Sequence, residues 1–115
     1  MINKLQEMFE SIGLPYYRQG SFVEGDSIPE SFYTFWNTDS PDFMYYDNRP
    51  RRSDWVIDVY YYTKDPGTIY SGITNLIEAA KNHGFIASGN GKDIASSIPD
   101  VFCRMTTIIY RQFYN

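Results

Sequence analysis

Residues that could carry out chemistry are scarce in this chain of 115 residues. It contains one histidine, His83, and one cysteine, Cys103. A single cysteine cannot form an intramolecular disulfide, and this pair cannot supply the ligands of a structural zinc site. The sequence places His83 at the end of a helix, where the helix dipole favours a cation, and Cys103 inside a strand, where it would be a small buried hydrophobe. We therefore expect both residues to be structural.

The carboxylates and glycines also fail to form a catalytic pattern. Asp54 and Asp58 are predicted to lie four residues apart on one strand face, roughly 13 Å from each other. That is too far to share a proton or to flank a glycosidic bond. The glycines Gly84, Gly89 and Gly91 do not follow a strand and open a helix, as a phosphate-binding loop would. We expect no enzymatic activity, no metal and no cofactor.

Composition excludes several classes of partner. The chain has 14 acidic and 10 basic residues, for a net charge of −4, which does not favour nucleic acid or an anionic membrane. No apolar run approaches the ~20 residues of a membrane helix, and no signal peptide is visible, so a cytoplasmic product is expected. The length predicts one domain over residues 1–115. Aromatic residues are abundant, at 18%.

The charge is distributed unevenly along the chain. Residues 1–48 hold eight acids and two bases, whereas residues 49–115 hold six acids and eight bases. Arg49, Arg51 and Arg52 lie within four positions of one another. They form either a solvated loop or a contact with an acidic partner surface, because arginine is enriched at interfaces.

Hydrophobic periodicity predicts two helices. Apolar residues at helical spacing indicate a helix from residue 2 to residue 12, with Asn3 as a possible cap and Gly13 as its stop. A second helix is predicted from Thr68, as its cap, to His83, with Gly84 closing it.

Alternation of side chains predicts the strands, which we place at 16–20, 31–38, 54–63, 85–89 and 101–113. A hairpin is expected over 41–54 with its tip near Asp47-Asn48, and an irregular connection from Asp93 to Asp100. The expected fold is α+β, with two helices packed on one face of a mostly antiparallel four- to five-stranded sheet and a long hairpin-like excursion.

Two helices can cover only one face of such a sheet, yet the strands carry large side chains on both faces. Tyr33, Tyr60, Tyr62 and Tyr110 suggest that the second face is not simply solvated. Either the 41–54 excursion covers that face, or another chain does. The contact candidates from this argument are Phe43, Met44, Tyr45, Tyr46, Arg49, Arg51, Arg52, Tyr60 and Tyr62.

The order, length and residue types of these segments resemble those of the tail completion proteins (tail terminators, head–tail joining proteins) of long-tailed bacteriophages and prophages. The resemblance covers most of the chain but includes no diagnostic motif. The segments that carry it are Gly13-Leu14-Pro15, Phe32-Tyr33-Thr34-Phe35-Trp36-Asn37, residues 55–65, the helix from Thr68 to His83, and residues 103–111.

The resemblance implies a non-enzymatic virion protein that forms a ring, commonly a hexamer, at the head–tail junction. Its implied partners are itself, the tail tube protein and head connector proteins, and its location is the virion, or the host cytoplasm during assembly. The excursion from Phe43 to Arg52 would make ring contacts. The alternative is a monomeric cytoplasmic binding module, immunity- or inhibitor-like, that presents its acidic N-terminal half to a basic target.

Overall fold

Two long antiparallel strands, β4 (Arg52–Thr63) and β7 (Phe102–Phe113), form the centre of the protein and pair along their whole length. The computed structural model describes residues 1–19, 29–43, 52–87, 89–96 and 98–113. The remaining elements are α1 (Ile2–Ile12), β1 (Tyr16–Arg18), β2 (Ser31–Asp39), β3 (Asp42–Phe43), a 3₁₀ turn (Pro66–Thr68), α2 (Ile69–Asn82), β5 (Ile86–Ala87) and β6 (Lys92–Ile94).

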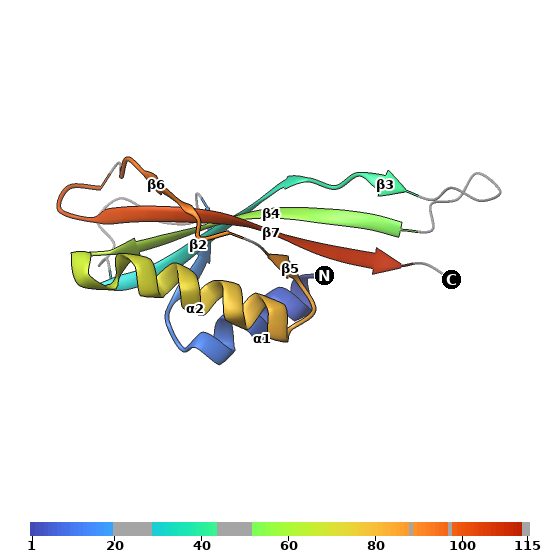
Figure 1. Ribbon diagram of the computed structural model, residues 1–115, viewed down its shortest axis with the longest axis horizontal. Helices are drawn as coiled ribbons and strands as arrows, with labels where there is room; N and C mark the ends of the chain where they lie inside the picture. The colour runs from blue at the N-terminus through green and yellow to red at the C-terminus, as the bar shows by residue number, and fades with distance from the viewer. Residues whose placement is uncertain (20–28, 44–51, 88, 97, 114–115) are drawn as a thin grey trace.

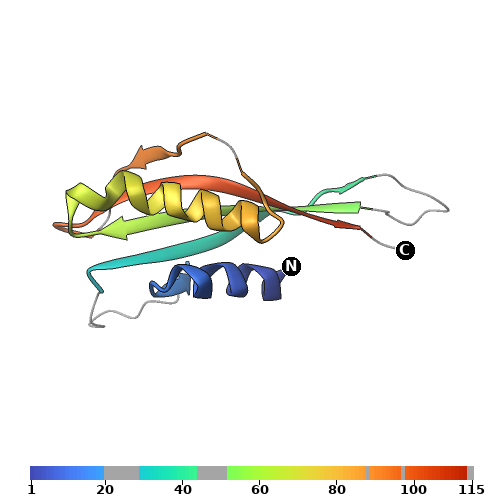
Figure 2. The same cartoon turned by 60° about the horizontal axis from the view of Figure 1, so that its bottom comes forward.

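The strands form one sheet in the order β1-β2-β4-β7-β5. The short strand β3 continues the β2 edge along β4, and β6 pairs with β7 beside β5. Within the described ranges, β1 and β2 run parallel and the other strand pairs are antiparallel. Both helices pack on the same face (Figure 1; Figure 2). The predicted α+β class is therefore confirmed.

Helix α1 follows its predicted spacing. Leu5, Met8 and Phe9 are fully buried against the sheet. The helix ends at Gly13, whose φ of 86° suits glycine and whose N–H donates to the Phe9 oxygen. The prediction that Asn3 caps this helix is wrong, because the helix begins one residue earlier, at Ile2.

Helix α2 also begins and ends close to the predicted residues. Thr68 is the residue before the helix, but its hydroxyl donates to the Asp65 oxygen instead of capping the helix. The Asp65 carboxylate accepts from the N–H of Gly67 and shapes the preceding turn. At the other end Gly84 has a φ of 85°, as expected for a glycine that closes a helix.

The core lies between the helices and the sheet face that they cover. Ile57, Val59 and Ile108 are buried there, and the ring of Tyr61 packs against Gly72 of α2. The alternation predicted for β4 is thus confirmed: every second residue from Ile57 to Tyr61 points into this core.

Two segments between the long elements differ in detail from the predictions. Residues 93–100 are not wholly irregular, because Lys92–Ile94 pairs with Met105–Cys103 as β6. The expected hairpin is supported where it is described, since β3 pairs with the start of β4; its tip near residues 47–48 lies outside the described residues.

The sheet is longer than its helical cover. The molecule measures 53 × 28 × 23 Å, and the ends of β4 and β7 that carry Arg52 and Phe113 extend past both helices together with β3 (Figure 1). We call this part the strand extension. Within it, Trp55 Nε1 donates to Gln112 Oε1 at 2.9 Å, so the two strands are also joined by side chains.

Candidate interaction surface

The second face of the sheet, away from the helices, is formed by alternate residues of three strands. Tyr60 and Tyr62 lie on it, as predicted. Tyr33 and Tyr110 do not, and the prediction that they contribute to this face is wrong. Tyr33 is paired with Tyr61 and Tyr110 packs on the core beside Phe85, so both point toward the helices. The second face consists of Phe32, Thr34, Trp36, Arg52, Asp54, Val56, Asp58, Tyr60, Tyr62, Cys103, Met105, Thr107, Ile109, Arg111 and Phe113.

One end of this face is already buried within the chain. Phe32 is inaccessible, and Cys103 and Met105 are buried although no helix covers them. Tyr62 stacks on Phe32, with ring centroids 5.0 Å apart and an interplanar angle of 10°. Tyr17 meets the same ring edge-on. The aromatic residues at this end therefore need no partner chain to cover them.

The middle of the second face is exposed. Trp36 is 47% exposed and Ile86 43% exposed, which is unusual for side chains of this size. Neighbouring side chains are paired across the strands in two rows, Trp36–Asp58–Thr107 and Val56–Ile109–Ile86. We call these six residues the exposed patch, although only Trp36, Thr107 and Ile86 are exposed and Val56, Asp58 and Ile109 are partly buried. Sequence analysis did not select any of them as contact residues, although the alternation in β4 and β7 places four of the six on this face.

A single carboxylate lies in this largely apolar patch. Asp58 accepts a hydrogen bond from the Thr107 hydroxyl at 2.7 Å. Among the described residues it takes part in no ion pair. The patch thus combines a negative charge that lacks a cation with a neighbouring indole and three aliphatic side chains.

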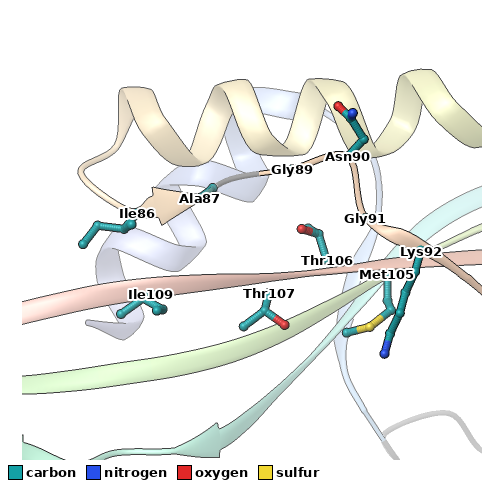
Figure 3. A pocket seen from close by; sticks show the side chains of 10 residues that line it. All are labelled: Ile86, Ala87, Gly89, Asn90, Gly91, Lys92, Met105, Thr106, Thr107 and Ile109. Carbon is teal, nitrogen blue, oxygen red and sulfur yellow. The ribbon is translucent and has the colours of Figure 1, made fainter.

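A pocket of about 450 Å³ adjoins the patch, at the edge of β7 (Figure 3). It forms because β5 pairs with Ile108 and Ile109 and β6 with residues 103–105, which leaves Thr106 and Thr107 without a strand partner on the edge of β7 that faces away from β4. In an antiparallel strand, alternate residues direct both backbone groups to the same edge. One of these two threonines therefore directs its N–H and C=O toward the pocket.

The loop that frames the pocket is held in place by β7. Gly91 has a φ of 76°, and a Cβ there would lie 2.5 Å from the Met105 oxygen, so only glycine fits. The Arg104 guanidinium donates to the backbone oxygens of Asn90 and Gly91 and pairs with Asp93 at 2.6 Å. The pocket is therefore preformed. No pattern in the sequence indicated this pocket.

The predicted arginine cluster is described only at Arg52. Its Nε lies 3.2 Å from Asp54 Oδ1, and Arg111 Nε lies 3.6 Å from Asp54 Oδ2. Asp54 is buried, so this carboxylate is neutralised within the chain. Phe43 pairs with Arg52 through the backbone of β3. The other candidates of the excursion, Met44, Tyr45, Tyr46, Arg49 and Arg51, lie outside the described residues.

The single histidine, His83, and the single cysteine, Cys103, lie in different parts of the fold. His83 Nδ1 lies 2.9 Å from the Ala79 oxygen at the end of α2. Cys103 is buried beside Tyr62 on the second face, and burial raises the pKa of its thiol to about 11. Burial likewise raises the pKa of Tyr62 to about 12. The described part of the chain contains no group of three or more His, Cys, Asp or Glu side chains placed to hold a metal ion.

Neither described helix is both long and apolar enough to cross a bilayer. No protein-family model matches the chain, and no curated protein matches it in sequence.

Proposed function

We propose that this chain is a non-enzymatic structural protein of a phage or prophage, a tail terminator or head–tail joining protein that forms a ring at the head–tail junction. The observation that carries the proposal is the exposed patch, because large apolar side chains gathered on a sheet face usually mark a protein contact. The α+β fold, with both helices on one face, is the fold that the sequence resemblance implies.

The shape of the protein also supports an assembly role. The strand extension, which includes β3, reaches past the helices (Figure 1) and carries the exposed Phe113. A ring subunit needs two different contact surfaces, one for each neighbour. The exposed patch and the strand extension are two such surfaces. Further partners would be the tail tube protein and head connector proteins, in the virion and, during assembly, in the host cytoplasm.

A monomeric inhibitor- or immunity-like module is the second candidate. It is favoured by the exposed acids Glu7, Glu10 and Glu30 in the N-terminal part of the chain. Such a module would bind a basic target through these side chains and would not use the exposed patch on the opposite side of the sheet from α1.

Deleting the gene distinguishes these functions. For a terminator, particles produced without the protein should have separate heads and tails, and tails of uncontrolled length, in negative-stain electron micrographs. Complementation with the intact gene should restore complete virions. Normal particles from the deletion strain would contradict the proposal, and a stable one-to-one complex with a basic protein would favour the second candidate.

A further inference from the structure

The last residues of β7 present a surface that matches the exposed patch in chemistry. Arg111 and Phe113 lie on the second face of the strand extension, two residues apart. The Arg111 side chain is 46% exposed and Phe113 is 65% exposed. This is a cation beside an aromatic ring, whereas the patch offers an anion beside aliphatic side chains.

The two surfaces also match in spacing. Arg111 and Phe113 are separated by one step of two residues along β7, about 6.5–7 Å. On the patch, the row that contains Asp58 and the row that contains Ile109 are separated by the same step, because Thr107 and Ile109 lie two residues apart. An arginine placed at Asp58 therefore brings the phenylalanine to the row of Val56, Ile109 and Ile86, beside the pocket.

Building on the proposed function, we infer that the end of β7 in one copy docks on the exposed patch of a second copy. The Arg111 guanidinium pairs with Asp58 and lies against the Trp36 indole, which is the preferred aromatic partner of a cation. Phe113 covers Ile86 and Ile109 at the mouth of the pocket. The contact thus gives a cation to Asp58, which has no cationic partner among the described residues, and it covers the exposed Trp36, Ile86 and Phe113 side chains.

This contact is head-to-tail, because the surface that docks and the surface that receives it are different. Each copy can dock on one neighbour and receive another, so the contact does not stop at a dimer. It closes into a ring or continues as a filament, according to the rotation between copies. The proposed ring thereby acquires a named pair of contact surfaces.

Charge reversal provides the test. Asp58→Arg and Arg111→Asp should each weaken self-association at least tenfold in sedimentation velocity, compared with the wild-type chain. In a one-to-one mixture of the two variants, head-to-tail contacts between unlike copies join opposite charges in both directions, so the mixture should assemble again with the variants alternating. Glu78→Arg, an exposed charge reversal on α2, is the matched control and should assemble like the wild type.

Because Arg111 also neutralises Asp54, a second measurement avoids that residue. In a Cys103→Ala background, Phe113→Cys and Ile86→Cys chains should form a mixed disulfide-linked dimer when oxidised together, and far less linked dimer when oxidised separately.

Suppose that the wild type assembles. If the single charge variants then assemble equally well, or if no mixed disulfide forms, this inference is overturned and the proposed function still stands. A wild-type chain that stays monomeric at its highest soluble concentration would also overturn it, whereas the proposed function is judged by the particles of the deletion strain.

Discussion

The hydroxyl of Tyr33 donates a hydrogen bond to the backbone oxygen of Gly72 at 2.7 Å, and this contact joins strand β2 to the first turn of α2. Gly72 also lies directly against the Tyr61 ring, where a Cβ would overlap the ring carbons. The two tyrosine rings are 5.0 Å apart. The helix can approach the sheet this closely only because residue 72 has no side chain.

Gly72→Ala should therefore destabilise the protein although alanine is the better helix former. Overpacking a core costs about 1–3 kcal/mol, and the gain in helix propensity returns only about 1 kcal/mol. Because Tyr61 is fully packed, we expect a net loss of about 1–2 kcal/mol. Urea denaturation followed by circular dichroism measures it. Asn75→Ala, at an exposed position of the same helix, should be neutral or stabilising, and equal effects of the two variants would contradict the close approach.

Stability should fall at alkaline pH. In the folded protein burial raises the pKa of Cys103 from 9.0 to about 11 and that of Tyr62 from 10.0 to about 12. The unfolded chain therefore loses these protons first, so unfolding becomes more favourable as the pH rises from about 9 toward 11. We expect a loss on the order of 1–2 kcal/mol over this range. Urea midpoints at pH 8 and pH 10.5 measure it, and Cys103→Ala should reduce the difference.

Cys103 should react slowly with thiol reagents in the native protein. Its side chain is buried, and the raised pKa of the thiol leaves little thiolate at neutral pH. Labelling without denaturant should be at least about tenfold slower than in urea. The matched control is Phe102→Cys in a Cys103→Ala background, since the neighbouring Phe102 is exposed and should be labelled quickly. Fast labelling of native Cys103 would show that the register of β7 is different.

Replacing Arg52 should affect stability, whereas replacing Arg49 and Arg51 should affect assembly alone. Arg49→Ser with Arg51→Ser should leave the free energy of unfolding nearly unchanged if the two side chains are solvated, because exposed charges contribute only about 0–1 kcal/mol each, and should weaken assembly if these residues form a contact. Adding Arg52→Ser should cost about 1–3 kcal/mol, because the buried Asp54 loses a charged partner. Thermal unfolding and sedimentation measure the two effects. Equal stability of the double and triple variants would show that Arg111 alone neutralises Asp54.

The sequence predicts the elements of this fold well and their surroundings less well. Local signals were sufficient for the two helices and their ends at Gly13 and Gly84, and for the long alternating strands. The short strand β6 was missed because three residues after a glycine turn carry too little periodicity. Tyr110 was placed on the wrong face because a strand that is bulky on both sides does not reveal which side meets the helices.

The sequence predicted exposed apolar side chains on the second face, but it did not predict which residues they would be. Exposed apolar side chains on the second face were expected, yet the exposed ones are Trp36, Ile86 and Phe113, whereas Tyr62 is half-covered by stacking on Phe32. Which part of a face is covered depends on contacts between distant segments, such as that between Tyr17 and Phe32, and no local pattern encodes them. The pocket depends likewise on where two short strands leave the edge of β7.

The central position of β7 has a consequence for synthesis on the ribosome. Strand β4 is completed at Thr63, but its partner β7 begins only at Phe102. At about 5–20 residues per second, the roughly 40 intervening residues take several seconds to be made. Throughout that interval one edge of β4 has no partner strand and its apolar side chains stay uncovered. Nascent chains in such a state tend to aggregate. Newly made copies should therefore depend on chaperones for solubility more than the stability of the finished sheet would suggest.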